Sequence, residues 1–187
     1  MNHQGTATIQ TDRLILRQLT LDDVQAAFRN WTNDPKVTEF LAWLPHGNIE
    51  VTKSVFSGWI AKYAEPDFYQ WAIVVKDINE PIGTITVNTI DEKTDTVQIG
   101  YCIGSSWWHK GYTSEAFCAV ISFLFEKVGV QRIEAHHDPE NPNSGKVMRK
   151  CGLSYEGTLR KASKSNRGIK DSCVYSILAP EYFKQQS

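Results

Sequence analysis

The chain has 187 residues, of which 41% are hydrophobic and 22% charged, and its formal net charge is -1 at pH 7. This length and composition fit one globular domain with one core and exclude a disordered chain. The near-zero charge gives no basic field, so we do not expect nucleic-acid binding. No apolar run reaches the roughly 20 residues of a membrane helix, and residues 1–5 lack signal-peptide character, which together predict a cytoplasmic protein with no membrane partner.

The first half of the chain predicts one short strand and two helices. Residues 14–17 form the strand, and the capping-box spacing of Thr20 and Asp23 starts a helix that runs to about Trp31. Apolar residues at helical spacing predict a second helix over residues 50–63.

The pattern then changes to a period of two. Strands are predicted over residues 71–75, 82–87 and 96–103, and Asn79-Glu80-Pro81 has the composition of a hairpin loop between the first two. Short connections between neighbouring strands favour antiparallel pairing.

The second half predicts two further helices. Apolar residues at helical spacing over residues 114–128 make one core stripe, and Gly129 ends it. A short helix over residues 143–151 is capped by Asn143 and ended by Gly152. The remaining predicted strands are 132–136, 153–158 and 173–178. Seven strands and four helices in this order predict an α+β fold, with one domain over residues 9–181.

The four cysteines are far apart and contain no Cys-x-x-Cys pair. They are Cys102, Cys118, Cys151 and Cys173. In a reducing compartment this spacing predicts four buried thiols and no zinc site, so no metal is expected.

The segment around Gly111 has the order strand, glycine-containing loop, long helix, which suits an anion. The first turn of a helix has N–H groups without partners, and its dipole favours negative charge. Gly111 lets the backbone approach a phosphate, and Lys110 and His109 add positive charge. A glycine that only makes a turn is the alternative, and the loop by itself does not decide between them.

The motifs around this loop favour the anion site over a simple turn. Ile99-Gly100-Tyr101, followed by Trp108-His109-Lys110-Gly111-Tyr112-Thr113-Ser114-Glu115-Ala116, resembles the stretch Ile-Gly-Tyr…Trp-Gly-Lys-Gly-Tyr-x-Thr-Glu-Ala of GNAT acyltransferases. That wording is typical of the branch that acetylates ribosomal-protein N-termini (RimJ/RimL-like). Further matching segments, in the family's order, are 11–17, 138–141 with Ser144, 150–153, 155–160 and 171–176.

The resemblance implies a GNAT N-acetyltransferase, a single-domain mixed seven-stranded sheet whose fourth and fifth strands splay apart, with the co-substrate acetyl-CoA in the gap. Backbone groups of Tyr101, Cys102 and Ile103 would contact the pantetheine. The pyrophosphate would lie on the loop residues Trp108, His109, Lys110, Gly111, Tyr112, Thr113 and Ser114. Two departures stand out: His109 replaces a family glycine, and Gln98 replaces a common glutamate.

The resemblance also assigns candidate catalytic residues. Asn141 would hydrogen-bond pantetheine or substrate, and Ser144 would approach the sulfur and protonate it; helix capping is the alternative for Ser144. Candidate bases are Glu134, His136 and His137, and the strand period puts the first two on one face and His137 on the other. A water chain to solvent is an equal alternative. For Cys102 we expect a backbone role with packing rather than a nucleophile.

Gln98 bears on the amine acceptor because a carboxamide cannot act as a base. An α-amine has a pKa near 8, so about a tenth is neutral at pH 7, against below about a thousandth of lysine. We therefore expect an acceptor with a protein N-terminal α-amine and direct transfer in a ternary complex. A small amine (polyamine, amino acid or antibiotic), a CoA-binding module without catalysis, and an RNA- or ribosome-binding protein remain alternatives, and a homodimer stays open.

Two segments have uses that the sequence leaves open. One is an aromatic and apolar cluster that shapes the acceptor pocket or belongs to the core: Phe40, Leu41, Trp43, Leu44 and His46. The other is a basic run within residues 160–170, expected to be a solvated face, with an acidic partner or the CoA phosphates as alternatives. Its members are Arg160, Lys161, Lys164, Arg167 and Lys170.

Overall fold

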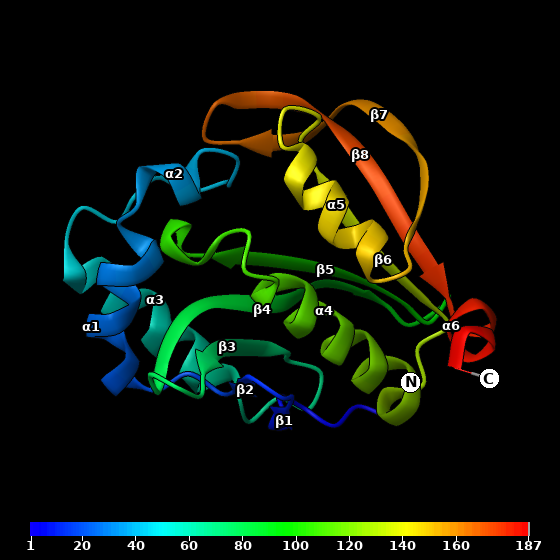
Figure 1. Cartoon of the computed structure of the whole chain (residues 1–187), viewed down its shortest axis with the longest axis horizontal. Helices are drawn as coiled ribbons and strands as arrows, with labels where there is room; N and C mark the ends of the chain where they lie inside the picture. The colour runs from blue at the N-terminus through cyan, green and yellow to red at the C-terminus, as the bar shows by residue number, and fades with distance from the viewer. Residues whose placement is uncertain (187) are drawn as a thin grey trace.

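The computed structural model describes residues 1–186, with side chains up to Gln185. One eight-stranded sheet runs through the molecule in the order β1-β2-β3-β4-β5-β6-β8-β7 (Figure 1). Its strands are β1 (Ile9–Gln10), β2 (Leu14–Arg17), β3 (Gln70–Val75), β4 (Glu80–Asp91), β5 (Thr96–Ile103), β6 (Arg132–His137), β7 (Ser154–Ser165) and β8 (Gly168–Leu178). Within residues 1–186 only β5 and β6 pair in parallel.

Helices cover both faces of this sheet. They are α1 (Val24–Ala27), α2 (Pro35–Thr38), α3 (Ile49–Lys62), α4 (Tyr112–Phe123), α5 (Pro142–Lys150) and α6 (Ala179–Gln186). Short turns extend α1 and α4: η1 (Leu21–Asp23) and η2 (Phe28–Thr32) flank α1, η3 (Ser105–Trp107) precedes α4, and η4 (Leu124–Val128) continues it. In Figure 1, α4 and α5 lie on the near side of the sheet.

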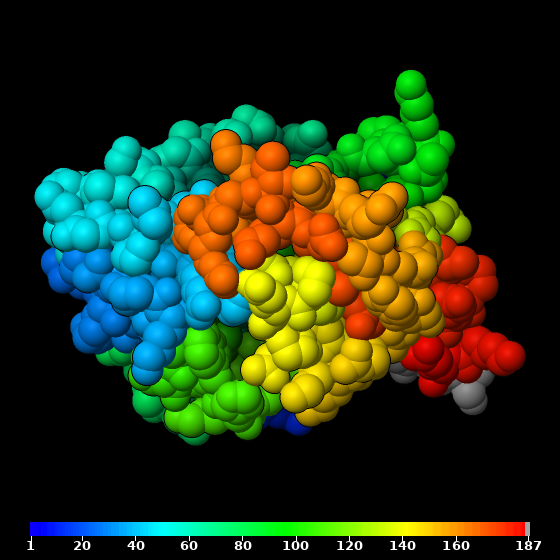
Figure 2. Space-filling view, turned by 90° about the horizontal axis from the view of Figure 1, so that it is seen from above, coloured from blue at the N-terminus to red at the C-terminus, as the bar shows by residue number. Residues whose placement is uncertain are grey.

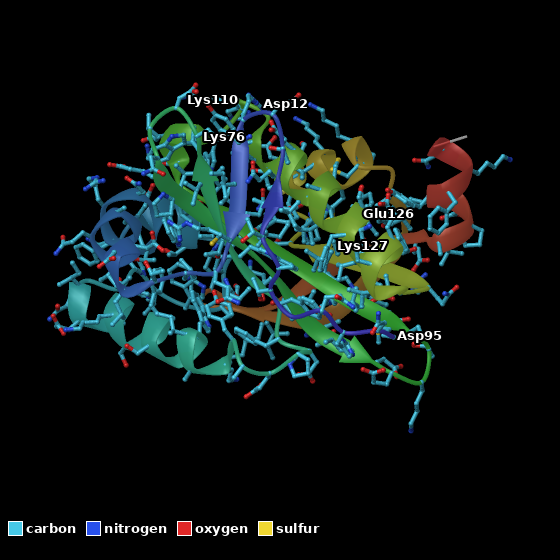
Figure 3. All side chains as sticks on the ribbon, turned by 90° about the horizontal axis from the view of Figure 1, so that it is seen from below. Asp12, Lys76, Asp95, Lys110, Glu126 and Lys127 are labelled. Atoms are coloured by element: carbon cyan, nitrogen blue, oxygen red, sulfur yellow. The ribbon has the colours of Figure 1, made fainter. Side chains whose placement is uncertain are left out.

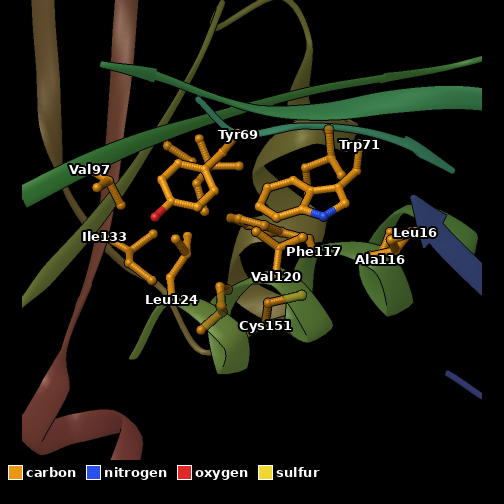
Figure 4. Packing of buried hydrophobic residues seen from close by; sticks show 14 of the residues in the cluster. Leu16, Tyr69, Trp71, Val97, Ala116, Phe117, Val120, Leu124, Ile133 and Cys151 are labelled. Atoms are coloured by element: carbon orange, nitrogen blue, oxygen red, sulfur yellow. The ribbon is translucent and has the colours of Figure 1, made fainter. Parts of the chain in front are cut away.

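The strand alternation creates two cores. Trp71 and Ile73 of β3 face α4, where they join a large cluster with Phe117 and Leu124 (Figure 4). Ala72 and Val74 of β3 face the other side of the sheet, where they pack with residues of α1, α2 and α3. The burial of these apolar faces on both sides of one strand fixes the register of the sheet.

The sheet opens between β5 and β6. Their parallel pairs run from Thr96↔Arg132 to Ile99↔Ala135 and stop there. Past that point β5 continues to Ile103, paired with β4 on its other side. The expected splay is therefore present between β5 and β6, which are the fourth and fifth strands when the two-residue β1 is not counted. Beyond Ile99, β5 has no partner strand on the β6 side among residues 1–186.

The expected count of seven strands and about four helices is wrong, because the described chain has eight strands and six α-helices. The additional elements, β1, α2 and α6, are two, four and eight residues long. Short elements of this kind are held by tertiary contacts, such as the pairing of β1 with β2, and leave a weak periodic pattern.

The predicted boundaries of β4 and α5 also differ. Glu80 and Pro81 belong to β4, so the hairpin turn lies over residues 76–79. Helix α5 begins at Pro142 with Asn141 as its N-cap residue, and Asn143 is not the cap. Proline is favoured at the first helical position, and this preference outweighs the capping preference of Asn143.

The last two strands are far longer than predicted and form one hairpin. Strands β7 and β8 pair from Ser154↔Ser176 to Ser165↔Gly168. The extension is polar and exposed on both faces, so it lacks the alternation on which the shorter prediction depended. At its tip, the Asn166 side chain donates to the backbone oxygens of Thr38 and Trp43 at 2.7 and 2.9 Å.

The tip of the hairpin therefore crosses to the segment between α2 and α3. In Figure 2 the orange tip meets the light-blue segment that follows α2. Across the helices of residues 1–186, none is long and apolar enough to span a membrane.

Candidate active site

The start of α4 presents a row of free backbone donors. Gly111 precedes the helix with φ 82°, and His109 has φ 62°, so the loop folds back through the left-handed region. None of the N–H groups from His109 to Ser114 donates to another group of the described chain. The first helical bond comes from the Glu115 N–H to the Gly111 oxygen at 3.0 Å. Six such donors beside a helix N-terminus fit a pyrophosphate.

Arg13 and Glu115 keep those donors free. The Glu115 carboxylate, in the first turn of α4, does not fold back onto the helix end, because Thr11 Oγ1 and Arg13 Nε each hold it at 2.6 Å. Burial opposes ionisation, yet these hydrogen bonds outweigh it and the pKa of Glu115 is lowered. Arg13 also donates to the Lys110 oxygen at 3.0 Å and lies over the Tyr112 ring.

Figure 3 places Lys110, Lys76 and Asp12 near one another along its upper edge. Lys110 is exposed and its ammonium has no partner within residues 1–186, so it is free to meet an anion at the loop. Trp108 anchors the loop within the chain, because its indole N–H donates to the Ile103 oxygen at 2.9 Å. The loop is thereby tied to the end of β5, and that carbonyl is engaged within the chain.

Tyr101 and Ser144 meet across the mouth of the split. The Tyr101 hydroxyl donates to the Ser144 backbone oxygen at 3.0 Å, and the two hydroxyls lie 3.0 Å apart. Tyr101 is packed against Phe117, and burial raises the pKa of its hydroxyl, which stays protonated. Because Ser144 bonds Tyr101, the capping alternative for Ser144 is wrong. No side-chain hydrogen bond holds the half-buried Asn141 within the described residues.

The opposite face of the split carries a polar group of its own. The Gln98 side-chain nitrogen lies 3.0 Å from His136 Nδ1, and His136 Nε2 lies 3.4 Å from the Glu134 carboxylate. The predicted division of faces is confirmed, since His137 points the other way, toward Gly145 of α5 and the Tyr175 ring. Arg132 donates to Glu134 at 2.7 Å and to Glu156 at 2.6 Å, and these bonds lower the pKa of the Glu156 carboxyl.

The cysteines differ from the prediction of four buried thiols. All four are free, but only Cys151 is buried, and Cys118 is exposed on α4. The helical stripe that faces the core passes through Phe117 and Val120 and leaves Cys118 at its edge. Burial raises the pKa of the Cys102 thiol, which lies 3.5 Å from Thr84 Oγ1, so a thiolate nucleophile is disfavoured.

Two predicted segments remain to be placed. The cluster from Phe40 to His46 is partly buried or exposed, and Leu41 and Trp43 pack against the second core, so the structure supports the core alternative for these two residues. Of the basic run, Arg160, Lys161 and Lys164 are exposed. Arg167 is also exposed, as expected for a solvated face, and forms surface ion pairs with Glu39 at 3.4 Å and Glu140 at 3.1 Å; Lys170 is half-buried and pairs with Glu140 at 3.3 Å.

Comparison with known proteins decides the family. The model of the acetyltransferase (GNAT) domain matches residues 13–154, about three quarters of the chain. The chain belongs to the GNAT acetyltransferase family.

Relatives agree with this assignment. The chain is 36% identical over 172 residues to the uncharacterized N-acetyltransferase YoaA of Bacillus subtilis, covering 92% of this chain and 97% of that protein. A GNAT acetyltransferase structure from Bacillus anthracis superposes with a TM-score of 0.82 at 25% identity, over 93% and 99% of the two chains. A more distant relative, the [ribosomal protein uS5]-alanine N-acetyltransferase of Escherichia coli, is 24% identical over 134 residues, 67% and 69% of the chains.

This GNAT chain is therefore an N-acetyltransferase that uses acetyl-CoA as its co-substrate. Its free loop donors and the open edge of β5 fit that molecule. Among residues 1–186, no group of three His, Cys, Asp or Glu side chains is placed to hold a metal ion.

Sequence reasoning missed two features of the site. The clamp of Arg13 on the loop joins residues about a hundred positions apart, and only the family motif around Arg13 signalled its importance. The contact of Gln98 with His136 depends on the parallel register Gln98↔Glu134. That register cannot be read from the spacing within either strand.

Proposed function

We propose that the chain acetylates a protein N-terminal α-amine, as a member of the RimJ/RimL-like branch, by direct transfer in a ternary complex, with its domain over residues 9–181. The observation that carries this proposal is Gln98 on the acceptor face of the split. The family's carboxylate is absent there, and the side chain instead contacts His136 at 3.0 Å. An α-amine is neutral far more often than lysine near pH 7, so it suits a site without that carboxylate.

The β7–β8 hairpin supports an acceptor that enters by its end. Its tip bonds the segment after α2 through Asn166, and Arg167 pairs with Glu39. The acceptor side is thus bridged by a strap of chain. A lysine in the middle of a folded surface would have to pass this strap, whereas a free chain end can extend beneath it. Similarity to the uS5-alanine N-acetyltransferase of Escherichia coli favours the same acceptor class.

The chemistry is divided among residues of the two faces. Backbone groups of Tyr101, Cys102 and Ile103 hold the pantetheine along the open edge of β5, and the N–H groups of residues 109–114 hold the pyrophosphate. Asn141 offers its free carboxamide to pantetheine or acceptor. Ser144 protonates the departing thiolate, and Tyr101 orients the Ser144 hydroxyl.

A panel assay tests the acceptor. Thiol release from acetyl-CoA is measured with N-terminal peptides, matched peptides that have a blocked α-amine and a free lysine, polyamines, amino acids and aminoglycosides. We expect the highest kcat/KM with a peptide whose α-amine is free, and mass spectrometry should place the acetyl group on that nitrogen. A preference for lysine peptides or small amines overturns the acceptor class.

The panel also separates the other readings. Binding of acetyl-CoA with no thiol release on any amine would indicate a CoA-binding module. The basic run gives little support to RNA binding, because Arg167 and Lys170 are already paired with carboxylates.

A further inference from the structure

Three buried polar atoms gather at the end of β6. They are His136 Nε2, His137 Nε2 and Asp138 Oδ2, the side-chain nitrogen and oxygen atoms of the described residues that are buried without a hydrogen bond. The two histidines point to opposite faces of the sheet, and His136 Nε2 has only an ion-pair contact, to Glu134 at 3.4 Å. Buried polar atoms are satisfied in almost all proteins, and exceptions concentrate where a substrate or water completes the site. These three lie where the β5–β6 pairing has just ended, at Ile99↔Ala135.

The two faces of the sheet at this split receive different substrates. The loop at the start of α4 and the Ser144 hydroxyl lie on the face covered by α4 and α5, so acetyl-CoA occupies that side. His137 belongs to the same face, and its Nδ1 already donates to the Asp138 oxygen at 2.8 Å. His136 points to the opposite face, which α1 and α3 cover farther along the sheet. The acceptor amine must approach from there.

His136 is placed as a base with an orienting carboxylate. Its Nδ1 faces Gln98 at 3.0 Å and its Nε2 faces Glu134 at 3.4 Å. Arg132 holds Glu134 at 2.7 Å, and Glu156 lies on the far side of Arg132, with its pKa lowered to about 2 by hydrogen bonds from Arg132 and Ser176. An imidazole with a proton on Nε2 beside a carboxylate keeps a lone pair on Nδ1.

We propose that His136 is the proton acceptor for the incoming amine, with Glu134 as its orienting partner. This inference rests on the proposed acetyl transfer. The acceptor ammonium gives one proton to His136 Nδ1, taking the place of the weakly donating Gln98 amide. The neutral nitrogen then forms a C–N bond to the thioester carbonyl, and the C–S bond breaks with its electron pair on sulfur. The nitrogen loses a second proton, the thiolate gains one, and the proton on His136 leaves to solvent.

The groups that lie near His136 come from four strands. Glu134 comes from β6 itself, Glu156 from β7, and Gln98 from β5 is neutral; from β8, Val174 is the residue paired with His136. The positive Arg132 is bound to both carboxylates.

Chemical rescue tests the assignment. The amine with the highest kcat/KM in the panel is used with the full chain, and His136→Ala and His136→Gln are compared with wild type. We expect kcat/KM for the amine to fall about 100-fold, in the range for loss of a general base, while KM for acetyl-CoA stays within about twofold. Imidazole added to His136→Ala should raise its kcat/KM for the amine about tenfold. A role that is only structural would not respond to imidazole.

A second variant places a different base in the same cavity. Gln98→Glu in the His136→Ala background should also recover activity, because the carboxylate lies where the imidazole was. His3→Gln, a histidine bonded to Tyr69 and Glu92 at the other end of β5, serves as the matched control and should match wild type. Thermal melting confirms that each variant is folded.

The outcomes are distinct. Near wild-type activity of His136→Ala, or a loss that neither imidazole nor Gln98→Glu relieves, overturns the role of His136. A preference of the wild type for a small amine overturns only the proposed acceptor class, and the His136 test is then decided with that amine. A wild type that acetylates no amine overturns both proposals.

Discussion

Ser144 offers the sharpest test at the scale of one residue. Its hydroxyl lies 3.0 Å from that of Tyr101 at the mouth of the split. Ser144→Ala should lower kcat about 10- to 100-fold, since an acid for the thiolate is lost, and should leave KM for acetyl-CoA almost unchanged. Steady-state kinetics against both substrates measures this.

Its neighbour provides the control. Asn143 contacts only Lys146, at 3.2 Å on the surface of α5, so Asn143→Ala should keep the wild-type kcat. Equal rates for Ser144→Ala and wild type would remove the acid role from Ser144.

Asp23 gives a pH dependence of stability. It is buried, and burial disfavours its ionised form, but hydrogen bonds from Arg17 at 2.8 Å and from the Thr20 N–H outweigh this and lower its pKa. The stabilisation is therefore complete above the unfolded value near 3.9 and is lost as pH falls through the lower folded value.

Asp23→Asn should reduce the free energy of unfolding by about 1–2 kcal/mol at pH 7. Urea denaturation at pH 7 and near pH 3 checks both statements, because the difference between variant and wild type should shrink at the lower pH. A difference that is constant with pH would contradict the ion pair as its source.

At the scale of elements, the start of α4 depends on Arg13 from the loop before β2. Arg13→Ala removes the bonds to Glu115 and the Lys110 oxygen, and it frees Glu115 to fold back onto the helix end. Loss of these bonds should weaken the binding of acetyl-CoA by about 1 kcal/mol. This corresponds to a roughly fivefold rise in KM for acetyl-CoA, with kcat little changed.

Arg29→Ala is a suitable comparison. Arg29 also pairs with a single glutamate, Glu80, at 2.8 Å, but on an exposed surface away from the loop. Calorimetric titration with CoA should show weaker binding for Arg13→Ala alone. Equal affinities would indicate that the loop holds its shape without the clamp.

The same elements show what sequence can and cannot supply. Helix α4 and strand β5 were predictable because their apolar residues repeat with the period of one buried face. The outer half of the β7–β8 hairpin was not, because residues exposed on both faces carry no alternation. The start of α5 was misplaced by two residues, since both Asn141 and Asn143 suit a cap and only the position of Pro142 separates them.

The candidate site likewise has a part that the sequence predicts and a part that it does not. The loop from Trp108 to Ser114 could be predicted because its residues are contiguous. The contact of Gln98 with His136 could not, since it joins strands 38 positions apart whose register is fixed by tertiary packing. Resemblance to a family supplied the function, but the family's own base position is the one in which this chain departs.

At the scale of the whole molecule, the β7–β8 hairpin at one edge of the sheet reaches the segment between α2 and α3. Its tip is attached to the α2–α3 segment by Asn166, whose side chain bonds Thr38 and Trp43 and whose N–H donates to the Leu41 oxygen at 2.9 Å. The Asn166 carboxamide supplies two of the bonds at this tip, next to the backbone bond and the ion pair of Arg167 with Glu39.

Asn166→Ala should loosen this strap. Losing two side-chain hydrogen bonds costs about 1–2 kcal/mol locally, so amide exchange over residues 160–170 should accelerate roughly tenfold. KM for the acceptor should rise several-fold while KM for acetyl-CoA, bound on the other face, stays the same. Lys164→Ala, an exposed change on the same hairpin, should alter neither quantity. If exchange accelerates but acceptor kinetics do not move, the hairpin stabilises the fold without bordering the path of the amine.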